Sequence, residues 1–248
     1  MSEPERFWSR PEWRGVGYRQ ILKRLHEAMR PATYLEIGVD KGHTLALAQC
    51  AAIAVDPTFP LDRPAMSNKP ACYFFRCTSD VFFRERNPTA LFGRPVDLAF
   101  LDGLHPYEVL LRDFFNTEKH CRRGSVILMH DCLPFDSYVA RREFGETRDR
   151  ERTAQPSFWA GDVWKTVAIL KTARPDLKII AYDAPPTGLI AVTNLDPASS
   201  VLEQRYFDLV AKMVDLDLAD AADDYYASLG VRMSETLDDA RLSLDYWL

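Results

Sequence analysis

Two nearly unbroken apolar runs, over residues 96–101 and 125–129, constrain the fold more than any other feature of this sequence. A strand with one face in water alternates between apolar and polar residues, whereas a strand of a parallel sheet is buried on both faces and does not alternate. Shorter apolar runs over residues 33–37, 51–55 and 71–76 come before them. Together with the helical stretches between them, these runs predict a doubly wound α/β domain built on a mostly parallel sheet.

The helices of this domain are expected between and around the strands. Apolar residues recur every three or four positions over residues 18–29, and Pro31 ends that helix. A second helix is expected over about residues 42–50. A third is expected from Pro106, because proline at a first helical position needs no N–H partner, and a fourth over residues 162–173.

The last third of the chain shows a different pattern. Residues 177–182 and 189–193 predict a final antiparallel pair of strands. Ser200 and Glu203 have the spacing of a capping box, which predicts that a C-terminal helix opens there. We therefore divide the chain into an N-terminal cap and helix (1–30), a core (31–196) with a charged insertion at about 141–160, and a C-terminal helical extension (197–248).

The composition fits one folded domain and excludes several classes of function. The chain has 248 residues, 47% of them hydrophobic, and a net charge of −5, which does not favour nucleic acid as a partner. No apolar stretch is long enough to cross a membrane, and the first residues lack the apolar core of a signal peptide. The five cysteines include no C-x-x-C pair, so we expect neither a disulfide framework nor a structural zinc site, and we predict a cytoplasmic protein.

The strongest local motif is Glu36-x-Gly38-x-x-x-Gly42, which begins at the end of the first strand. Glycines permit positive φ and let a ligand approach the backbone closely. The motif lacks the early G-x-G pair of a dinucleotide-binding loop. An acid two residues before the first glycine also suits a cationic ligand better than a pyrophosphate.

Two further acidic positions lie at the ends of the next strands. Asp56 ends the second strand, where an acid can accept both hydroxyls of a ribose. Ser79 and Asp80 come just past the third strand, where an adenine amino group would need an acceptor, although Ser-Asp is also a common helix cap.

With the glycine motif, these acids resemble the class I S-adenosylmethionine-dependent methyltransferases over about residues 34–193. The resemblance implies a Rossmann-like methyltransferase fold, with a seven-stranded sheet and a reversed last strand. It also implies that the loop with Gly38 and Gly42 cradles the methionine part of the cofactor.

A second block, over residues 97–108 and 124–131, resembles the small-molecule O-methyltransferase branch that includes sugar and macrolide-sugar enzymes. In that group, acids at the ends of the fourth and fifth strands hold Mg²⁺, which binds the substrate hydroxyls. Asp102, which also borders the expected cofactor site, matches the first position, and Asp131 matches a later one. His130 departs from the pattern, because it falls where those enzymes often carry a carboxylate or amide.

Histidine is a poor ligand for Mg²⁺ and a better one for softer metals, which leaves three alternatives open. The site is built from Asp102, Asp131 and one further group, or His130 is a base, or there is no metal. A metal lowers the pKa of a bound hydroxyl, whereas a histidine takes the proton directly. Because His105 and His130 are both expected at the carboxyl ends of strands, we predict that at least one of them is catalytic.

The predicted function is methyl transfer from S-adenosylmethionine to a hydroxyl of a small molecule such as a sugar or glycoside, with Mg²⁺ or another divalent metal. The alternatives are an NAD-dependent oxidoreductase and a non-catalytic nucleoside-binding protein.

Two segments outside these motifs have alternative interpretations. Residues 141–152 hold five arginines and four acids, and they form either a solvated loop or a lid, because loops after parallel strands lie at the edge where ligands bind. An N-terminal cluster with Trp8, Arg10 and Trp13 is either a cap on the acceptor pocket or a contact in a homo-oligomer.

Overall fold

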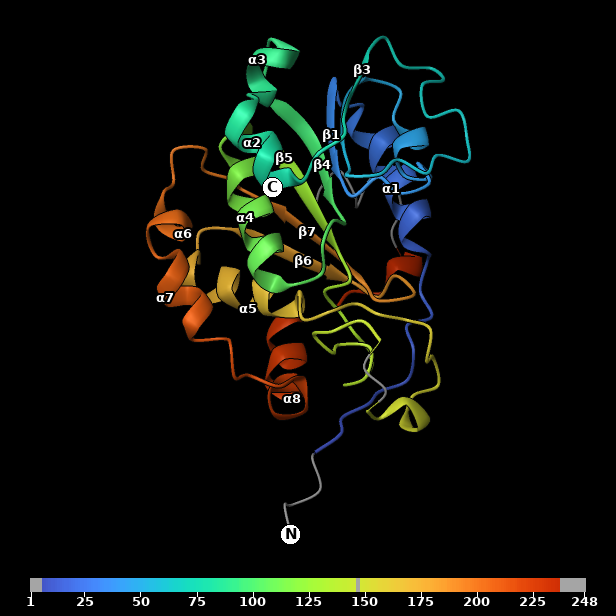
Figure 1. Ribbon diagram of the computed structural model, residues 1–248, viewed down its shortest axis with the longest axis vertical. Coiled ribbons are helices and arrows are strands. Elements are labelled where there is room, and N and C mark those ends of the chain that lie inside the picture. The colour runs from blue at the N-terminus through green and yellow to red at the C-terminus, as the bar shows by residue number, and fades with distance from the viewer. Residues whose placement is uncertain (1–5, 146–147, 237–248) are drawn as a thin grey trace.

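The computed structural model describes residues 6–145 and 148–236, and it contains a seven-stranded sheet with the strand order β3-β2-β1-β4-β5-β7-β6 (Figure 1). The strands are β1 Thr33–Ile37, β2 Ala51–Val55, β3 Cys72–Phe75, β4 Val96–Leu101, β5 Cys121–His130, β6 Lys178–Tyr182 and β7 Leu189–Thr193. Neighbouring strands from β3 to β5 are parallel, and β7 is antiparallel to both β5 and β6. The predicted sheet with a reversed last strand is confirmed.

Alternate residues of the strands pack into two separate cores. Leu35 and Ile37 of β1 belong to the larger core, and Tyr34 belongs to the smaller one. The larger core is covered by α2 Ser79–Glu85, α3 Pro88–Phe92, α4 Tyr107–Glu118, α5 Trp164–Ala173, α6 Val201–Gln204, α7 Tyr206–Ala211 and α8 Leu218–Leu229. In the described part of the chain, only one α-helix, α1 Tyr18–Met29, covers the smaller core, and Figure 1 shows it across the sheet from α2 and α4.

The prediction of a helix over residues 42–50 is wrong. The structure has only a 3₁₀ helix there, η1 Leu45–Leu47. Gly42 has a φ of +78° and closes a turn in which its N–H donates to the carbonyl of Val39 at 2.8 Å. Thr44 then turns its side chain inward to Glu36, so the backbone reaches β2 before a regular helix can form.

The helix expected to open at Ser200 is present as α6, with Ser200 as its N-cap residue, but the capping box expected there is wrong. An N-cap residue needs an extended backbone before its side chain can reach the N–H groups of the first turn. Ser200 has φ −112° and ψ 7°, and its side chain makes no cap hydrogen bond to the four-residue α6. The helix expected from Pro106 is present, with Pro106 as the N-cap residue of α4.

The N-terminal aromatic cluster packs within its own chain. Trp8 stacks on Tyr226 of α8 with ring centroids 5.1 Å apart, and the Trp13 indole N–H donates to the carbonyl of Leu133 at 2.7 Å. Ser9 also forms an isolated bridge with Asp136. The segment therefore lies against residues 133–136, just after the carboxyl end of β5.

The described residues of the charged insertion are anchored where it leaves the core. Arg142 forms ion pairs at 2.8 Å with both Glu108 and Asp162. Arg141 donates to the carbonyls of Tyr138 and Phe158, and a 3₁₀ helix, η2 Arg150–Arg152, follows. A further 3₁₀ helix, η3 Ser234–Thr236, ends the described chain, so parts of the expected cap and C-terminal extension lie outside the described residues.

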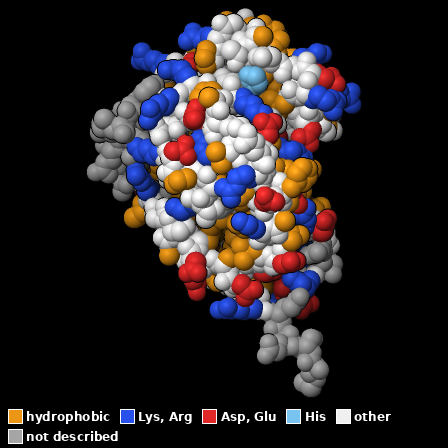
Figure 2. Space-filling model, turned by 90° about the vertical axis from the view of Figure 1, so that its left-hand side faces the viewer, with side chains coloured by type: hydrophobic (Ala, Val, Ile, Leu, Met, Phe, Trp, Pro, Cys, Tyr) orange, Lys and Arg blue, Asp and Glu red, His pale blue; other side chains and the backbone are white. Residues whose placement is uncertain are grey.

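Basic and acidic side chains are interspersed over the face of the molecule seen in Figure 2, with apolar side chains between them. Among the residues that the structure describes, no helix is both long enough and apolar enough to cross a membrane.

Candidate active site

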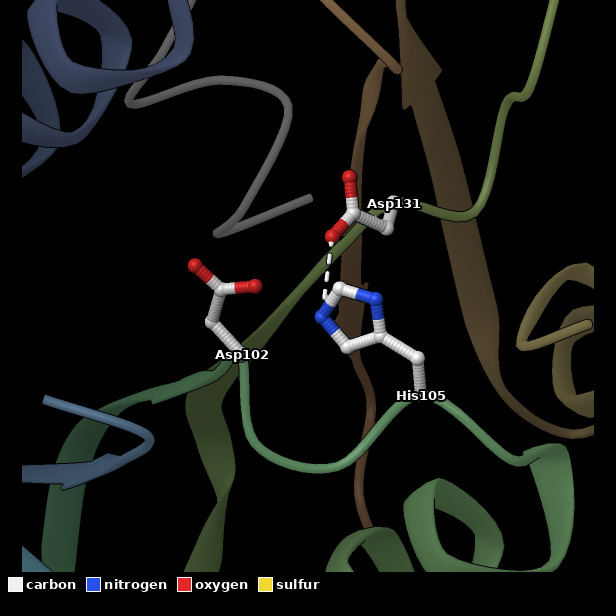
Figure 3. A group of neighbouring side chains, drawn as sticks. All are labelled: Asp102, His105 and Asp131. Carbon is white, nitrogen blue, oxygen red and sulfur yellow. Dashed lines mark ion pairs between the residues drawn. The ribbon is translucent and has the colours of Figure 1, made fainter. Parts of the chain in front are cut away.

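Three of the side chains singled out in the sequence converge at the carboxyl edge of the sheet. Asp102 follows β4 and Asp131 follows β5, and these two strands are parallel neighbours, so the residues after them emerge side by side. His105 comes from the loop between β4 and α4. Figure 3 shows the three side chains pointing toward one another, and their potential ligand atoms all lie within 4.8 Å of one another.

The neighbours of His105 determine which nitrogen of its ring carries a hydrogen. Its Nδ1 lies 3.2 Å from the carbonyl oxygen of Trp159, and its Nε2 lies 3.3 Å from a carboxylate oxygen of Asp131. A carbonyl can only accept, so Nδ1 carries a hydrogen. In a neutral ring, Nε2 then presents a lone pair to an anionic oxygen. The contact is favourable only if the ring is protonated or a cation lies between the two groups.

His130, the last residue of β5, is buried beside both carboxylates. Its Nδ1 lies 3.3 Å from Asp102 and 3.2 Å from Asp131, and its ring centroid is 4.1 Å from that of Tyr18. Burial alone would lower the pKa of His130, but Asp131 and Asp102 outweigh burial and raise the pKa well above its usual value. The imidazolium of His130 therefore balances part of the negative charge at this edge.

Asp131 is held in an unusual conformation. Its φ of +61° lies in the left-handed region, which Asp adopts more readily than most residues but still at a cost. The hydroxyl of Thr187 donates to its carboxylate. Burial would raise the pKa of Asp131, but His130, His105 and the Thr187 hydrogen bond lower it to about 2, so the carboxylate is ionised.

The glycine loop packs directly against this group of side chains. Gly38 has a φ of +82°, and a Cβ at this position would overlap the carbonyl oxygen of Asp102 and come within 2.7 Å of the Cα of Gly103. Glycine is therefore required here by the close approach of two backbones.

Glu36 does not face an open site. It is fully buried, and its carboxylate accepts hydrogen bonds at 2.6 Å from the hydroxyls of Tyr34 and Thr44. Burial raises the pKa of Glu36 to about 8, although these two hydrogen bonds partly oppose the rise. In this conformation the side chain of Glu36 ties the glycine loop to β1 through its hydrogen bond from Thr44.

Asp56 holds the same loop from the end of β2. One carboxylate oxygen accepts the backbone N–H groups of Val39 and Asp40 at 2.8 and 2.9 Å, and the other accepts the N–H and hydroxyl of Thr58 at 2.8 and 3.1 Å. Burial would raise the pKa of Asp56, but these hydrogen bonds lower it. A carboxylate has about four acceptor positions, and all are used here.

Ser79 and Asp80 form the first turn of α2, for which Thr78 is the N-cap residue. Ser79 is buried. Both oxygens of Asp80 accept hydrogen bonds at 2.8 Å from the guanidinium of Arg112 on α4. This bidentate pair lowers the pKa of Asp80 and leaves an acceptor position on each oxygen.

The structure adds partners that the sequence motifs did not indicate. Trp159 stacks on His105 with ring centroids 4.7 Å apart, and Tyr18 covers His130. Thr187 reaches Asp131 from the segment before β7, and Arg112 reaches Asp80 from α4. These residues belong to segments far apart in the chain, so no local spacing could have identified them.

Comparisons with known proteins agree with this fold. The model of a family described as a methyltransferase domain matches residues 35–132, from β1 to just past the end of β5. The crystal structure of cofactor-bound Rv0187 from MTB has a TM-score of 0.50 and 16% identity, over 72% of this chain and 80% of that chain. No curated protein matches the sequence.

Two further solved structures belong to O-methyltransferases. One is the enzyme from Bacillus cereus in complex with SAH, with 16% identity, a TM-score of 0.48 and coverage of 71% of this chain and 80% of that chain. The other is TomG from Streptomyces achromogenes, involved in tomaymycin synthesis and in complex with SAM, with 14% identity, a TM-score of 0.48 and coverage of 71% and 78%.

The matched domain, the strand order and the reversed β7 together show the fold of the class I S-adenosylmethionine-dependent methyltransferases.

Proposed function

We propose that this methyltransferase transfers the methyl group of S-adenosylmethionine to a hydroxyl of a small molecule such as a sugar or glycoside, at a divalent metal centre. The observation that carries the proposal is the convergence of Asp102, His105 and Asp131 beside the glycine loop. Two carboxylates and an imidazole are a donor set for a divalent ion, and the imidazole favours a transition metal over Mg²⁺.

The residues present fit such an ion. The Nε2 of His105 and a carboxylate oxygen of Asp131 are 3.3 Å apart, close enough for both atoms to bind one ion. The carbonyl of Trp159 keeps the hydrogen of His105 on Nδ1, which leaves Nε2 as the ligand atom. A bound divalent ion lowers the pKa of a hydroxyl that it contacts, which is the chemistry that an oxygen nucleophile requires.

The sequence predicts that at least one of His105 and His130 is catalytic, and we assign the two histidines different roles. His105 is the third ligand of the proposed centre. His130 holds a proton between Asp102 and Asp131 and so limits the negative charge that the site presents. The acceptor proton leaves to solvent.

For the cofactor, we propose that the loop with Gly38 and Gly42 and the side chain of Asp102 line its methionine part, and that Glu36 keeps the loop in place. Ribose hydroxyls would bind Asp56 by replacing the two hydrogen bonds from Thr58, since the bonds to the loop N–H groups hold the loop itself. The match to a methyltransferase domain supports this placement.

For the adenine, we propose that its amino group binds next to Ser79 and Asp80. The acceptor positions that the Arg112 pair leaves open on Asp80 support this. The cytoplasmic location and the homo-oligomer remain predictions.

The proposal is tested by measuring S-adenosylhomocysteine release from the purified protein with a panel of sugars, glycosides, catechols and primary amines. We expect release with a hydroxylated acceptor, loss of release in chelator, and recovery with Mn²⁺. Asp131→Asn should lose activity, whereas Asp149→Asn should keep it, because Asp149 shares the left-handed backbone but lies in the charged insertion. Methylation of amines alone, or full activity in chelator, contradicts the proposal.

A further inference from the structure

A cavity of about 580 Å³ lies at the edge of the sheet opposite the candidate active site. Its walls come from the second half of α1 and from residues 46–50, which lie just before the amino ends of β1 and β2. In the described chain, α1 is the only α-helix over this face, and the neighbouring segment forms only the short η1. Its volume is typical of a site for a small molecule.

One residue that lines this cavity, His26, is a histidine whose ring has no hydrogen-bond partner among the described residues. His26 follows Ile21, Leu22 and Leu25 on the buried face of α1, where an apolar side chain would pack without cost. His26 is only 8% exposed, and within the described chain neither ring nitrogen has a hydrogen-bond partner. Its ring contacts the edge of Tyr34, with centroids 4.8 Å apart. Buried polar atoms are normally paired, so these two nitrogens indicate a missing partner.

The charged groups around His26 are mostly basic. Arg30 lines the cavity and is exposed, and it makes no ion pair with any described residue. The amino group of Lys69 is buried and has no hydrogen-bond partner among the described residues. Burial, together with the charge of Lys69, lowers the pKa of His26 to about 4. Glu27, the acid that lines the cavity, is paired with Lys23 at 3.4 Å. The unpaired groups are therefore two cations and a neutral imidazole, all of which can donate hydrogen bonds.

We propose that this cavity binds a small molecule through an oxyanion, a phosphate or a carboxylate, which accepts a hydrogen bond from His26 and an ion pair from Arg30. The site is independent of the proposed methyl transfer, and it lies at the opposite edge of the sheet from Asp102 and Asp131. Lys69 adds positive charge near the imidazole.

The proposal is tested by NMR of the full chain labelled with ¹⁵N-histidine, titrated separately with inorganic phosphate and with acetate. We expect a saturable shift of the His26 ring signals with at least one of the two anions, and the stronger response identifies the class of ligand. His120 is a control within the chain, because it is also partly buried but its ring already contacts the hydroxyl of Thr89 at 3.1 Å. Its signals and those of His105 should not move.

Two variants separate the site from general charge effects. Arg30→Asn removes the cation and keeps a residue that tolerates the left-handed φ of 45° at this position. It should weaken the apparent affinity about tenfold, as expected for a charge-assisted contact. Arg94→Asn removes the same charge outside the cavity lining and should have no effect. An absent His26 response to both anions, or an equal response in Arg30→Asn and the wild type, overturns the proposal.

Discussion

The buried carboxyl of Glu36 should make the stability of this protein depend on pH in an unusual direction. Burial raises its pKa from 4.5 to about 8, so the folded protein binds a proton over this range that the unfolded chain has released. The free energy of unfolding therefore falls as pH rises from about 4.5 to 8, and it is flat above the folded pKa. At about 1.4 kcal/mol per pH unit, the loss from this one group is roughly 5 kcal/mol.

Glu36→Gln tests this directly, because glutamine keeps the shape and can still accept a hydrogen bond from Tyr34 or Thr44 but cannot ionise. Urea unfolding of both proteins should show that the wild type loses about 2 to 3 kcal/mol relative to the variant between pH 6 and pH 8. Burial also raises the pKa of Asp113, to about 7. Asp113 makes the same contribution to the pH dependence of both proteins, so it cancels in the comparison. Parallel pH profiles for the two proteins would refute the reasoning.

Four further outcomes are expected. Gly38→Ala should lose about 2 kcal/mol or more of stability, measured by urea unfolding, because its Cβ would overlap the carbonyl of Asp102; an unchanged midpoint contradicts this. Asp56→Ala should weaken S-adenosylmethionine binding in calorimetry by about 1.5–3 kcal/mol, and equal affinity in the folded variant removes Asp56 from the site. In hydrogen exchange, residues 148–152 should gain protection with cofactor and acceptor if they form a lid, whereas equal protection identifies a surface loop. His105→Gln should lose metal affinity while it keeps cofactor affinity, and unchanged metal affinity excludes His105 as a ligand.

The strands could be predicted from the sequence because burial on both faces leaves a local signature. The runs at β1, β2, β4 and β7 were predicted with the boundaries that the structure has. The convergence of Asp102 and Asp131 could also be predicted from the sequence, because residues after neighbouring parallel strands emerge at the same edge of the sheet.

The rest depended on contacts between distant segments. Local propensity favoured a helix over residues 42–50, but the hydrogen bond from Thr44 to Glu36 turns the chain there instead. The sequence likewise gave no indication that Asp56 is saturated by its own loop or that Asp80 is paired with Arg112, since these depend on side-chain geometry.

The central claim, that Asp102, His105 and Asp131 form a metal centre in a methyltransferase site, is tested most directly by calorimetric titration of Mn²⁺ into the protein saturated with S-adenosylhomocysteine. The account predicts that one ion binds per chain in the wild type and in Asp149→Asn, and that binding is lost in Asp131→Asn. Binding of equal strength in all three proteins, or no binding in the wild type, would contradict it.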